Sequence, residues 1–421
     1  MAGLVSSLQA ALNRQIGIDE YLIWSTIAAV LMFFHLTGTF QAGYAIVILN
    51  ALLLMASDRL TIHRTHMGLI VALAGFSLIG AELSGTPLKG PVSQILGISI
   101  LSVYFFTALT SFGLSLSRWM ELYMRAAFAL TVYALITWPI VTLFSGDPRL
   151  RAVYSEPSYF VYVTLPALGY CVNRYAAERR YGAESVIFLL SYVLADSSLG
   201  FLGLLLVGLF TYAPRYRGWQ LLAGAILICA LLSGLYLASA NVRLRANEMV
   251  VAIASQDLSS TGNTTFAFLS NIYVTSQSFL AHPLTGIGIG GYANAYDKYV
   301  GNITGIGVLT NSERDPSVVL NREDAASMFL RVTAELGVPG LALLVGFLIV
   351  CARVRGQPYI AIRNSLLPYL IVRMTRMGHY FTVELYFFVG IYLLNYLSYR
   401  KVGSIAASPP FSRTPIESKP V

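Results

Sequence analysis

Apolar runs of about twenty residues recur along most of this chain, and a run of that length crosses the hydrocarbon core of a bilayer as one helix. Of the 421 residues, 56% are hydrophobic and only 11% are charged, whereas a soluble domain usually carries about a quarter charged residues. The mean hydropathy of +0.66 points the same way. The sequence therefore predicts an all-α, polytopic membrane protein.

We expect about twelve membrane-spanning helices, because that many separate apolar runs can be distinguished. Two of them are short and are separated by Asp196-Ser197-Ser198, so they form either a hairpin or one broken helix. The predicted spans centre near residues 20–37, 39–57, 67–84, 92–115, 121–145, 157–173, 184–196, 197–213, 219–240, 337–354, 361–379 and 380–398.

Arginine and lysine residues gather in alternate short connections, for example at Arg59 with Arg64 and at Arg353 with Arg355. Such a bias marks the cytoplasmic side, and it accounts for the formal net charge of +8 without a nucleic-acid partner. Both termini are then expected in the cytoplasm. We assign residues 1–403 to one membrane domain and the Ser- and Pro-rich residues 404–421 to a disordered cytoplasmic tail.

The three cysteines, Cys171, Cys229 and Cys351, lie in or beside apolar runs. Their spacing fits neither a disulfide framework nor a Cys/His metal site. The outer connections also lack a pair of aspartates suited to a metal ion. We therefore expect neither a metal nor another cofactor.

One long polar segment, residues 241–335, interrupts the apolar pattern and is expected to form a large, mostly helical loop outside the membrane. Within it, Thr264 to Ala281 has the periodicity of an amphipathic helix. Residues 301–321 have the composition of a loop, and Glu323 onward reads as a helix that continues into the tenth span. Loops held on a rigid scaffold often carry the chemistry of a protein, so we expect the function where this segment meets the bilayer.

Glycines in this segment match the pattern G-x-G-x-x-G at Gly286, Gly288 and Gly291. Dinucleotide binding requires a preceding strand and a βαβ unit, and neither is predicted here. A tight turn between two helices is the simpler interpretation. We favour a turn that also lies close to a substrate, since glycine permits close backbone approach.

Arg373, Arg376 and His379 share one helix face near the outer end of the eleventh span. Cations in a membrane span are costly and usually have a partner or a function. Glu384, at the start of the next span, is one candidate partner for Arg373, and an anionic ligand is another. A purely structural ion pair is the competing interpretation.

Two further groups of charges lie near the same predicted surface. Arg151 and Glu156 flank the start of the sixth span. Either this segment only starts a helix, with Pro157 in its first turn and Ser155 or Glu156 as its cap, or Arg151 and Glu156 face a shared cavity in the outer leaflet. Arg243 and Arg245 lie where the ninth span leaves the membrane. These two arginines either extend to the interface as long side chains do or grip a diphosphate through several hydrogen bonds.

Arg331 and Glu335 are spaced i, i+4, which predicts a salt bridge on the surface of a helix. A carboxylate at this place is also a candidate general base for a sugar hydroxyl.

The chain resembles the bacterial O-antigen polymerase and O-antigen ligase superfamily, whose members are polytopic GT-C type glycosyltransferases. Their pattern is a large periplasmic loop with a Pro-x-x-Gly-x-Gly turn, followed by a Glu-Leu-Gly that re-enters the membrane. Pro283, Gly286 and Gly288 match the turn, and Glu335-Leu336-Gly337 matches the re-entry. The segment from Glu156 to Phe160 resembles one found in capsule and exopolysaccharide polymerases.

The resemblance has two departures. Ligases typically carry a histidine about nine residues before the glutamate of Glu-Leu-Gly, where this chain has Ala326, and an arginine that is missing between Thr264 and Ala281. These departures favour a polymerase over a ligase, and they leave the general base unassigned. His282 and His379 are the histidines expected on the outer side.

The resemblance implies a metal-independent polymerase in the bacterial inner membrane. Its partners would be two undecaprenyl-diphosphate-linked oligosaccharides, membrane lipids and a chain-length co-polymerase. The arginines at 151, 243, 245, 373 and 376 would hold the leaving diphosphate, and Glu156, Glu335 and His379 would activate the acceptor or orient those arginines. An O-antigen ligase or a protein-glycosylating transferase is the nearest alternative. A lipid-glycan flippase is a more distant alternative, because no internal repeat is visible. A structural scaffold in an envelope complex is another, and it would leave the arginines of the membrane spans without a role.

Overall fold

The computed structural model describes residues 17–32, 35–37, 40–212, 233–234, 236–237, 240–255, 263–302 and 322–406. Nearly all of these residues are helical, apart from an antiparallel pair of very short strands, β1 (His35–Thr37) and β2 (Phe40–Gln41). The all-α prediction is therefore confirmed. In chain order the helices at the predicted spans are α2 (Ile18–Leu31), α3 (Ala42–Ala56), α4 (Arg64–Ser84), α5 (Lys89–Ser111), α6 (Leu116–Ser145), α7 (Pro157–Glu178), α8 (Gly182–Ala195), α9 (Ser198–Tyr212), α15 (Met328–Cys351), α16 (Tyr359–Arg376) and α17 (Val383–Ala406).

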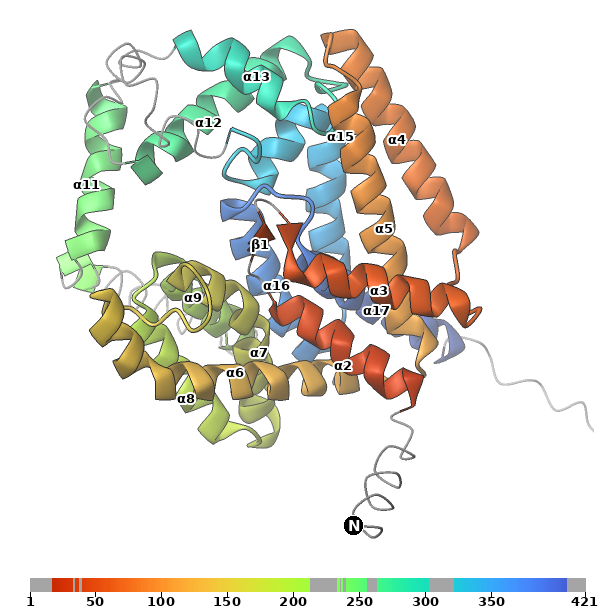
Figure 1. The fold of residues 1–421 in the computed structure, drawn as a ribbon, viewed down its shortest axis with the longest axis vertical. Helices are drawn as coiled ribbons and strands as arrows, with labels where there is room; N and C mark the ends of the chain where they lie inside the picture. The colour runs from red at the N-terminus through yellow and green to blue at the C-terminus, as the bar shows by residue number, and fades with distance from the viewer. Residues whose placement is uncertain are drawn as a thin grey trace, which may run out of the picture.

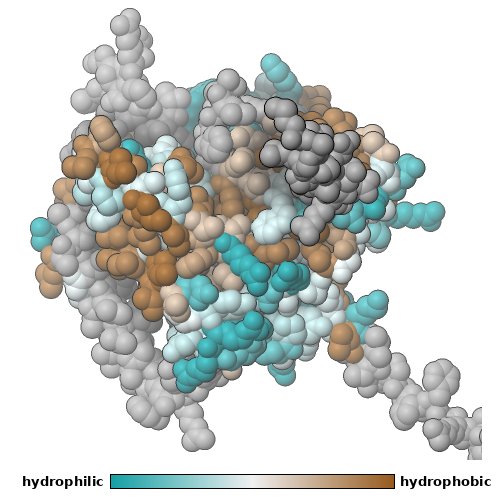
Figure 2. All heavy atoms as spheres, turned by 60° about the horizontal axis from the view of Figure 1, so that its bottom comes forward, coloured by the Kyte–Doolittle hydropathy of each residue, from teal (hydrophilic) through white to brown (hydrophobic). Residues whose placement is uncertain are grey.

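Each predicted span except 219–240 coincides with one of these helices, and that span falls mostly outside the described residues. Four helices within the described part of the chain, α4, α5, α6 and α15, are long and apolar enough to cross a membrane, while α3, α8 and α9 are apolar but shorter. Large hydrophobic side chains on their outer faces are exposed, such as Leu143 at 84% and Phe144 at 90% on α6. On the face drawn in Figure 2, hydrophobic residues gather to one side of a hydrophilic area. Exposed apolar surface of this extent fits a helical membrane protein.

The helices α7 and α16 form the centre of the bundle, where they pack against each other and are surrounded by α6, α8, α9 and α17 (Figure 1). Gly169 of α7 allows this packing, because a Cβ there would lie 2.9 Å from the Cα of Ser365 on α16. Beside them, rings from two helices meet edge to face, including Tyr123 with Phe388 at 5.0 Å between centroids. Tight packing of this kind fixes the position of α16, and with it the positions of the side chains at the end of that helix.

The question left open at Asp196 is settled by the backbone. Asp196 has left-handed dihedral angles (φ 41°, ψ 49°), a conformation that ends a helix. The chain therefore forms two separate helices, α8 and α9, and both pack against α7.

The polar segment forms α11 (Ala240–Ser255), α12 (Asn263–Ala281), α13 (Tyr292–Tyr299) and the short 3-10 helix η2 (Val300–Asn302). In Figure 1, α12 and α13 lie beyond one end of the bundle, at the top of the view. The amphipathic helix predicted for 264–281 is confirmed as α12. The helix expected from Glu323 is wrong by several residues: it begins at Met328, because Ala325 and Ala326 have positive φ and Ser327 caps the helix by accepting from the amide of Leu330.

Candidate functional site

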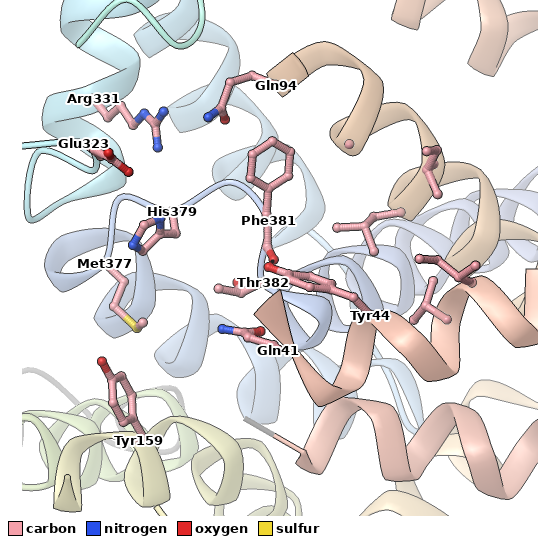
Figure 3. Close-up of a pocket in the computed structure, with 15 residues that line it drawn as sticks. Gln41, Tyr44, Gln94, Tyr159, Glu323, Arg331, Met377, His379, Phe381 and Thr382 are labelled. Carbon is pink, nitrogen blue, oxygen red and sulfur yellow. Dashed lines mark hydrogen bonds between the residues drawn. The ribbon is translucent and has the colours of Figure 1, made fainter. Parts of the chain in front are cut away.

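A cavity of about 490 Å³ lies where the polar segment meets the bundle, a size typical of ligand pockets. One part of its wall is polar and another is apolar. In Figure 3, Arg331, Glu323 and His379 lie on one side of the cavity, Tyr44 and Gln41 on the other, and Phe381 between them. The wall consists of Gln41, Tyr44, Val47 and Ile48 from β2 and α3, Gln94, Gly97, Ile100 and Leu101 from α5, Tyr159 from α7, Glu323 and Arg331 from the start of the α15 region, and Met377, His379, Phe381 and Thr382.

The last four residues belong to the connection between α16 and α17, residues 377–382, which we call the outer connection after the side of the membrane predicted for it. Arg373, in the last turn of α16, holds it from within the bundle. Its Nη1 donates to the carbonyl of Met377 at 2.7 Å, and its Nη2 donates to the carbonyl of His379 at 3.2 Å and to Oγ1 of Thr382 at 2.6 Å. Its Nε donates to Glu384 at 3.3 Å. Glu384, one of the two partners predicted for Arg373, is therefore its observed partner, and both side chains are buried.

Arg331 holds the outer connection from the other side. Its Nε donates to Oε1 of Glu335 at 3.1 Å, and its Nη1 donates to the carbonyl of Gly378 at 3.1 Å. Its guanidinium carbon lies 4.3 Å from the centroid of the Tyr380 ring, a cation–π contact. The salt bridge predicted from the i, i+4 spacing is confirmed. Its expected place on the helix surface is wrong, since both partners are buried.

Glu335 connects Arg331 to residues 286–291, which we call the glycine turn. Besides Arg331, its Oε1 accepts from the backbone amides of Gly290 at 2.9 Å and of Tyr292 at 3.3 Å. Three N–H donors therefore meet at one carboxylate oxygen. These contacts give Glu335 a structural task, and it is not among the residues that line the cavity.

His379 faces the cavity and has a carboxylate behind it. Its Nε2 lies 3.4 Å from Oδ2 of Asp324, and 47% of the imidazole side chain is exposed. The other oxygen of Asp324 accepts from the amide of Ala326 at 3.1 Å, which fixes the orientation of the carboxylate. The partial burial of its ring lowers the pKa of His379 below its ordinary value, Asp324 opposes this change, and Arg331 and Arg373 add to it. A histidine with a lowered pKa is neutral at pH 7 and able to accept a proton.

The glycines of this turn lie close to the backbone of other parts of the protein, and not to the cavity. A Cβ at Gly286 would overlap the backbone of Glu335, and one at Gly288 would lie 2.6 Å from the carbonyl of Ser77 on α4. The amide of Gly288 donates to the carbonyl of Glu335 at 2.9 Å, where Gly337 breaks α15 with φ 62° and ψ −155°. The turn is thus wedged between α4, α5 and the bend in α15. Neither Gly286 nor Gly288 lines the cavity.

Arg376 lies one residue before the outer connection. Its guanidinium carbon is 5.3 Å from the centroid of the Phe268 ring on α12, so Arg376 links α16 to the polar segment. It lies next to the site and does not line the cavity itself.

The remaining predicted residues are placed less centrally. Glu156 is the N-cap residue of α7, where its Oε2 accepts from Ser158 at 3.0 Å, three residues from Tyr159 of the cavity wall. Arg151 lies in the connection before it. Arg243 is exposed on α11, which Figure 1 shows at the edge of the molecule, away from α15 and α16. Arg245 belongs to the same helix.

Sequence reasoning singled out the charged group that contains Asp324, but it missed the pairing of Asp324 with His379 and most of the cavity wall. Gln41, Tyr44, Gln94, Tyr159 and Phe381 carry no motif, and they come from elements far apart in the chain. The one available signal was the acidic Arg322-Glu323-Asp324 before the tenth span. Within the described residues, no three His, Cys, Asp or Glu side chains are arranged to hold a metal ion, and metal independence stays a prediction.

Comparison with protein-family models finds none that matches this chain. Comparison with curated proteins finds no relative either.

Proposed function

We propose that the chain is a polymerase of lipid-linked oligosaccharide repeat units, which transfers a growing glycan from one undecaprenyl diphosphate to the non-reducing end of another repeat unit. The observation that carries this proposal is the cavity, in which His379, backed by Asp324, and the buried Arg331 lie opposite an apolar wall. A polar headgroup attached to a long isoprenoid chain requires both kinds of surface in one place.

The two parts of the cavity wall suit the two parts of such a substrate. Val47 and Ile48 of α3 and Ile100 and Leu101 of α5 offer an apolar surface. Ile48 and Ile100 are also exposed at the surface of the protein. Arg331 stands at the polar end. Its Nε and Nη1 bond to the protein, while Nη2 donates to none of the described residues. Nη2 of Arg331 can therefore donate a hydrogen bond to a diphosphate oxygen, and Arg376 lies next to the site.

The reaction follows from these positions. His379 accepts the proton of the acceptor hydroxyl as this oxygen attacks the anomeric carbon of the donor glycan. Asp324 beside Nε2 favours the tautomer that carries its proton there, which leaves Nδ1 as the base. The bond between the anomeric carbon and the diphosphate oxygen breaks, and undecaprenyl diphosphate leaves. Arg331 stabilises the charge that grows on that oxygen, a contribution that is usually large in a site shielded from water.

We place this polymerase in the bacterial inner membrane with about twelve spans, both termini in the cytoplasm and residues 241–335 in the periplasm. The cavity lies at the end of the bundle that carries this segment, which supports chemistry on the outer side. A chain-length co-polymerase is the proposed protein partner.

The test is elongation by the purified protein in detergent, supplied with lipid-linked repeat units and no ion gradient. We expect a ladder of products that is lost in His379→Ala, while His63→Ala keeps it, because His63 lies before α4 outside the cavity wall. Absence of a ladder, together with transfer to lipid A-core or to a protein acceptor, would replace the polymerase by a ligase. Gradient-driven movement of intact lipid-linked units without any transfer would replace it by a flippase.

A further inference from the structure

The guanidinium of Arg373 is used entirely inside the protein. All three of its nitrogens donate to protein groups, two of which are carbonyls of the outer connection and one the hydroxyl of Thr382. The side chain is fully buried, and it does not line the cavity. This geometry differs from the diphosphate-binding role that its place in the sequence predicted.

We propose that Arg373 is a positioning residue that shapes the outer connection so that His379 faces the cavity beside Asp324. This inference rests on the proposed function, in which His379 is the base. Arg373 acts on the carbonyl of His379 itself and on the residues at both ends of the connection, so that the backbone on either side of the histidine is fixed.

The chemistry of the contact requires an arginine. A planar guanidinium reaches two carbonyls, a hydroxyl and a carboxylate at once, whereas a lysine ammonium has three donors around a single nitrogen. Glu384 keeps the guanidinium in place, since a buried cation without its partner is strongly destabilising. Lysine at this position therefore keeps the charge near Glu384 but releases part of the connection.

Arg363 provides a matched control at the opposite end of the same helix. Its Nη1 donates to the carbonyls of Ala352 and Val354, both at 3.3 Å, and its Nε donates to Asn364 at 2.8 Å. It thus performs a similar carbonyl-binding task far from the cavity. A lysine at Arg363 tests the general cost of losing such a contact.

The experiment compares the wild type, Arg373→Lys and Arg363→Lys in the elongation assay over a range of pH. For Arg373→Lys we expect kcat to fall about tenfold or more, because a small displacement of a catalytic group is costly, while the KM for the lipid-linked unit changes by less than about twofold. Arg363→Lys should keep both constants. A rise in KM of tenfold or more in Arg373→Lys with an unchanged kcat would show that Arg373 binds the substrate and would overturn the proposal.

A second readout reports on His379 without any turnover. The charged groups that act on its imidazole are Asp324 and Glu323 from the loop before α15, Arg331 from α15 and Arg373 from α16. The largest effect on the pKa of His379 is the partial burial of the ring, which lowers the pKa. When the connection loosens, the imidazole gains water and its pKa rises toward its ordinary value. Its modification by diethyl pyrocarbonate, followed by mass spectrometry, should then become at least about threefold faster well above that pKa, and the midpoint of its pH dependence should move to higher pH.

The two readouts separate failure of this inference from failure of the proposed function. A wild type that does not elongate any lipid-linked unit refutes the polymerase, and the reactivity of His379 still reports on Arg373. Unchanged reactivity and an unchanged midpoint in Arg373→Lys refute the positioning role even where the wild type is active.

Discussion

Substitutions of Glu335 can distinguish a catalytic carboxylate from a structural one. It was predicted as a candidate general base, yet its Oε1 already accepts from Arg331 and from the amides of Gly290 and Tyr292. Glu335→Gln keeps an oxygen acceptor of the same shape and removes the charge. Glu335→Ala removes the acceptor altogether. A base would not tolerate either change, whereas a structural junction should tolerate the first much better.

The magnitudes follow from burial. Alanine at 335 leaves Arg331 as an uncompensated buried cation, and breaking a buried pair in this way costs about 3–5 kcal/mol. Glutamine also removes the compensating charge, but it keeps an oxygen that can accept the same hydrogen bonds. It should therefore recover about 1–3 kcal/mol of that cost, the contribution of a buried hydrogen bond to a charged group. The double variant Arg331→Met with Glu335→Leu should recover much of the stability, because replacing both members of a buried ion pair by apolar groups is often close to neutral.

The assay combines denaturant unfolding of the purified protein with elongation. For Glu335→Gln we expect a measurable loss of stability and elongation within about tenfold of the wild type, well short of the 10²–10⁴-fold loss that removal of a general base causes. A Glu335→Gln variant with wild-type stability and activity below about one hundredth would refute the structural interpretation and identify Glu335 as the base.

Three further predictions test the placement of the site. Gly378→Ala should reduce elongation at least about tenfold, because a Cβ there would overlap the carbonyl of Asp324, while Gly346→Ala, with open space around it, should leave elongation intact; equal effects would argue against the tight contact. Arg376→Ala should abolish polymer while protein level and single repeat units persist, as seen by gel analysis of cell glycans, and polymer of normal length would remove Arg376 from the mechanism. Arg243→Ala should change kcat/KM by less than about twofold, since an exposed arginine away from the cavity lacks a contact specific to the transition state, and a tenfold loss would restore Arg243 as a binding residue.

Much of the helical architecture could be predicted from the sequence, because an apolar run of sufficient length has few alternatives to a helix. The partner of Arg373 was also predictable, since Glu384 is the nearest carboxylate along the chain. The start of α15 was not. Its boundary depends on the positive φ of Ala325 and Ala326, which L-residues rarely adopt and which no residue pattern announces.

The candidate site was predicted only in part, because burial and proximity depend on packing between distant elements. The spacing of Arg331 and Glu335 indicated a salt bridge, but its burial depends on the glycine turn that packs over it. Arg243 looked equivalent to Arg376 as an outer arginine, and only the arrangement of α11 separates the two. His379 was identified as a candidate, whereas its partner Asp324 becomes visible only when the two loops are brought together.

The central claim is that the cavity between α3, α5 and the outer connection holds the diphosphate of a lipid-linked glycan. The most direct measurement is photo-crosslinking of the purified protein with an undecaprenyl diphosphate analogue that carries a photoreactive group beside its diphosphate, followed by peptide mapping. We expect labels within residues 322–331 and 377–382 that unmodified undecaprenyl diphosphate competes away. Competed labels confined to the opposite end of the bundle, at residues 352–364, would contradict it.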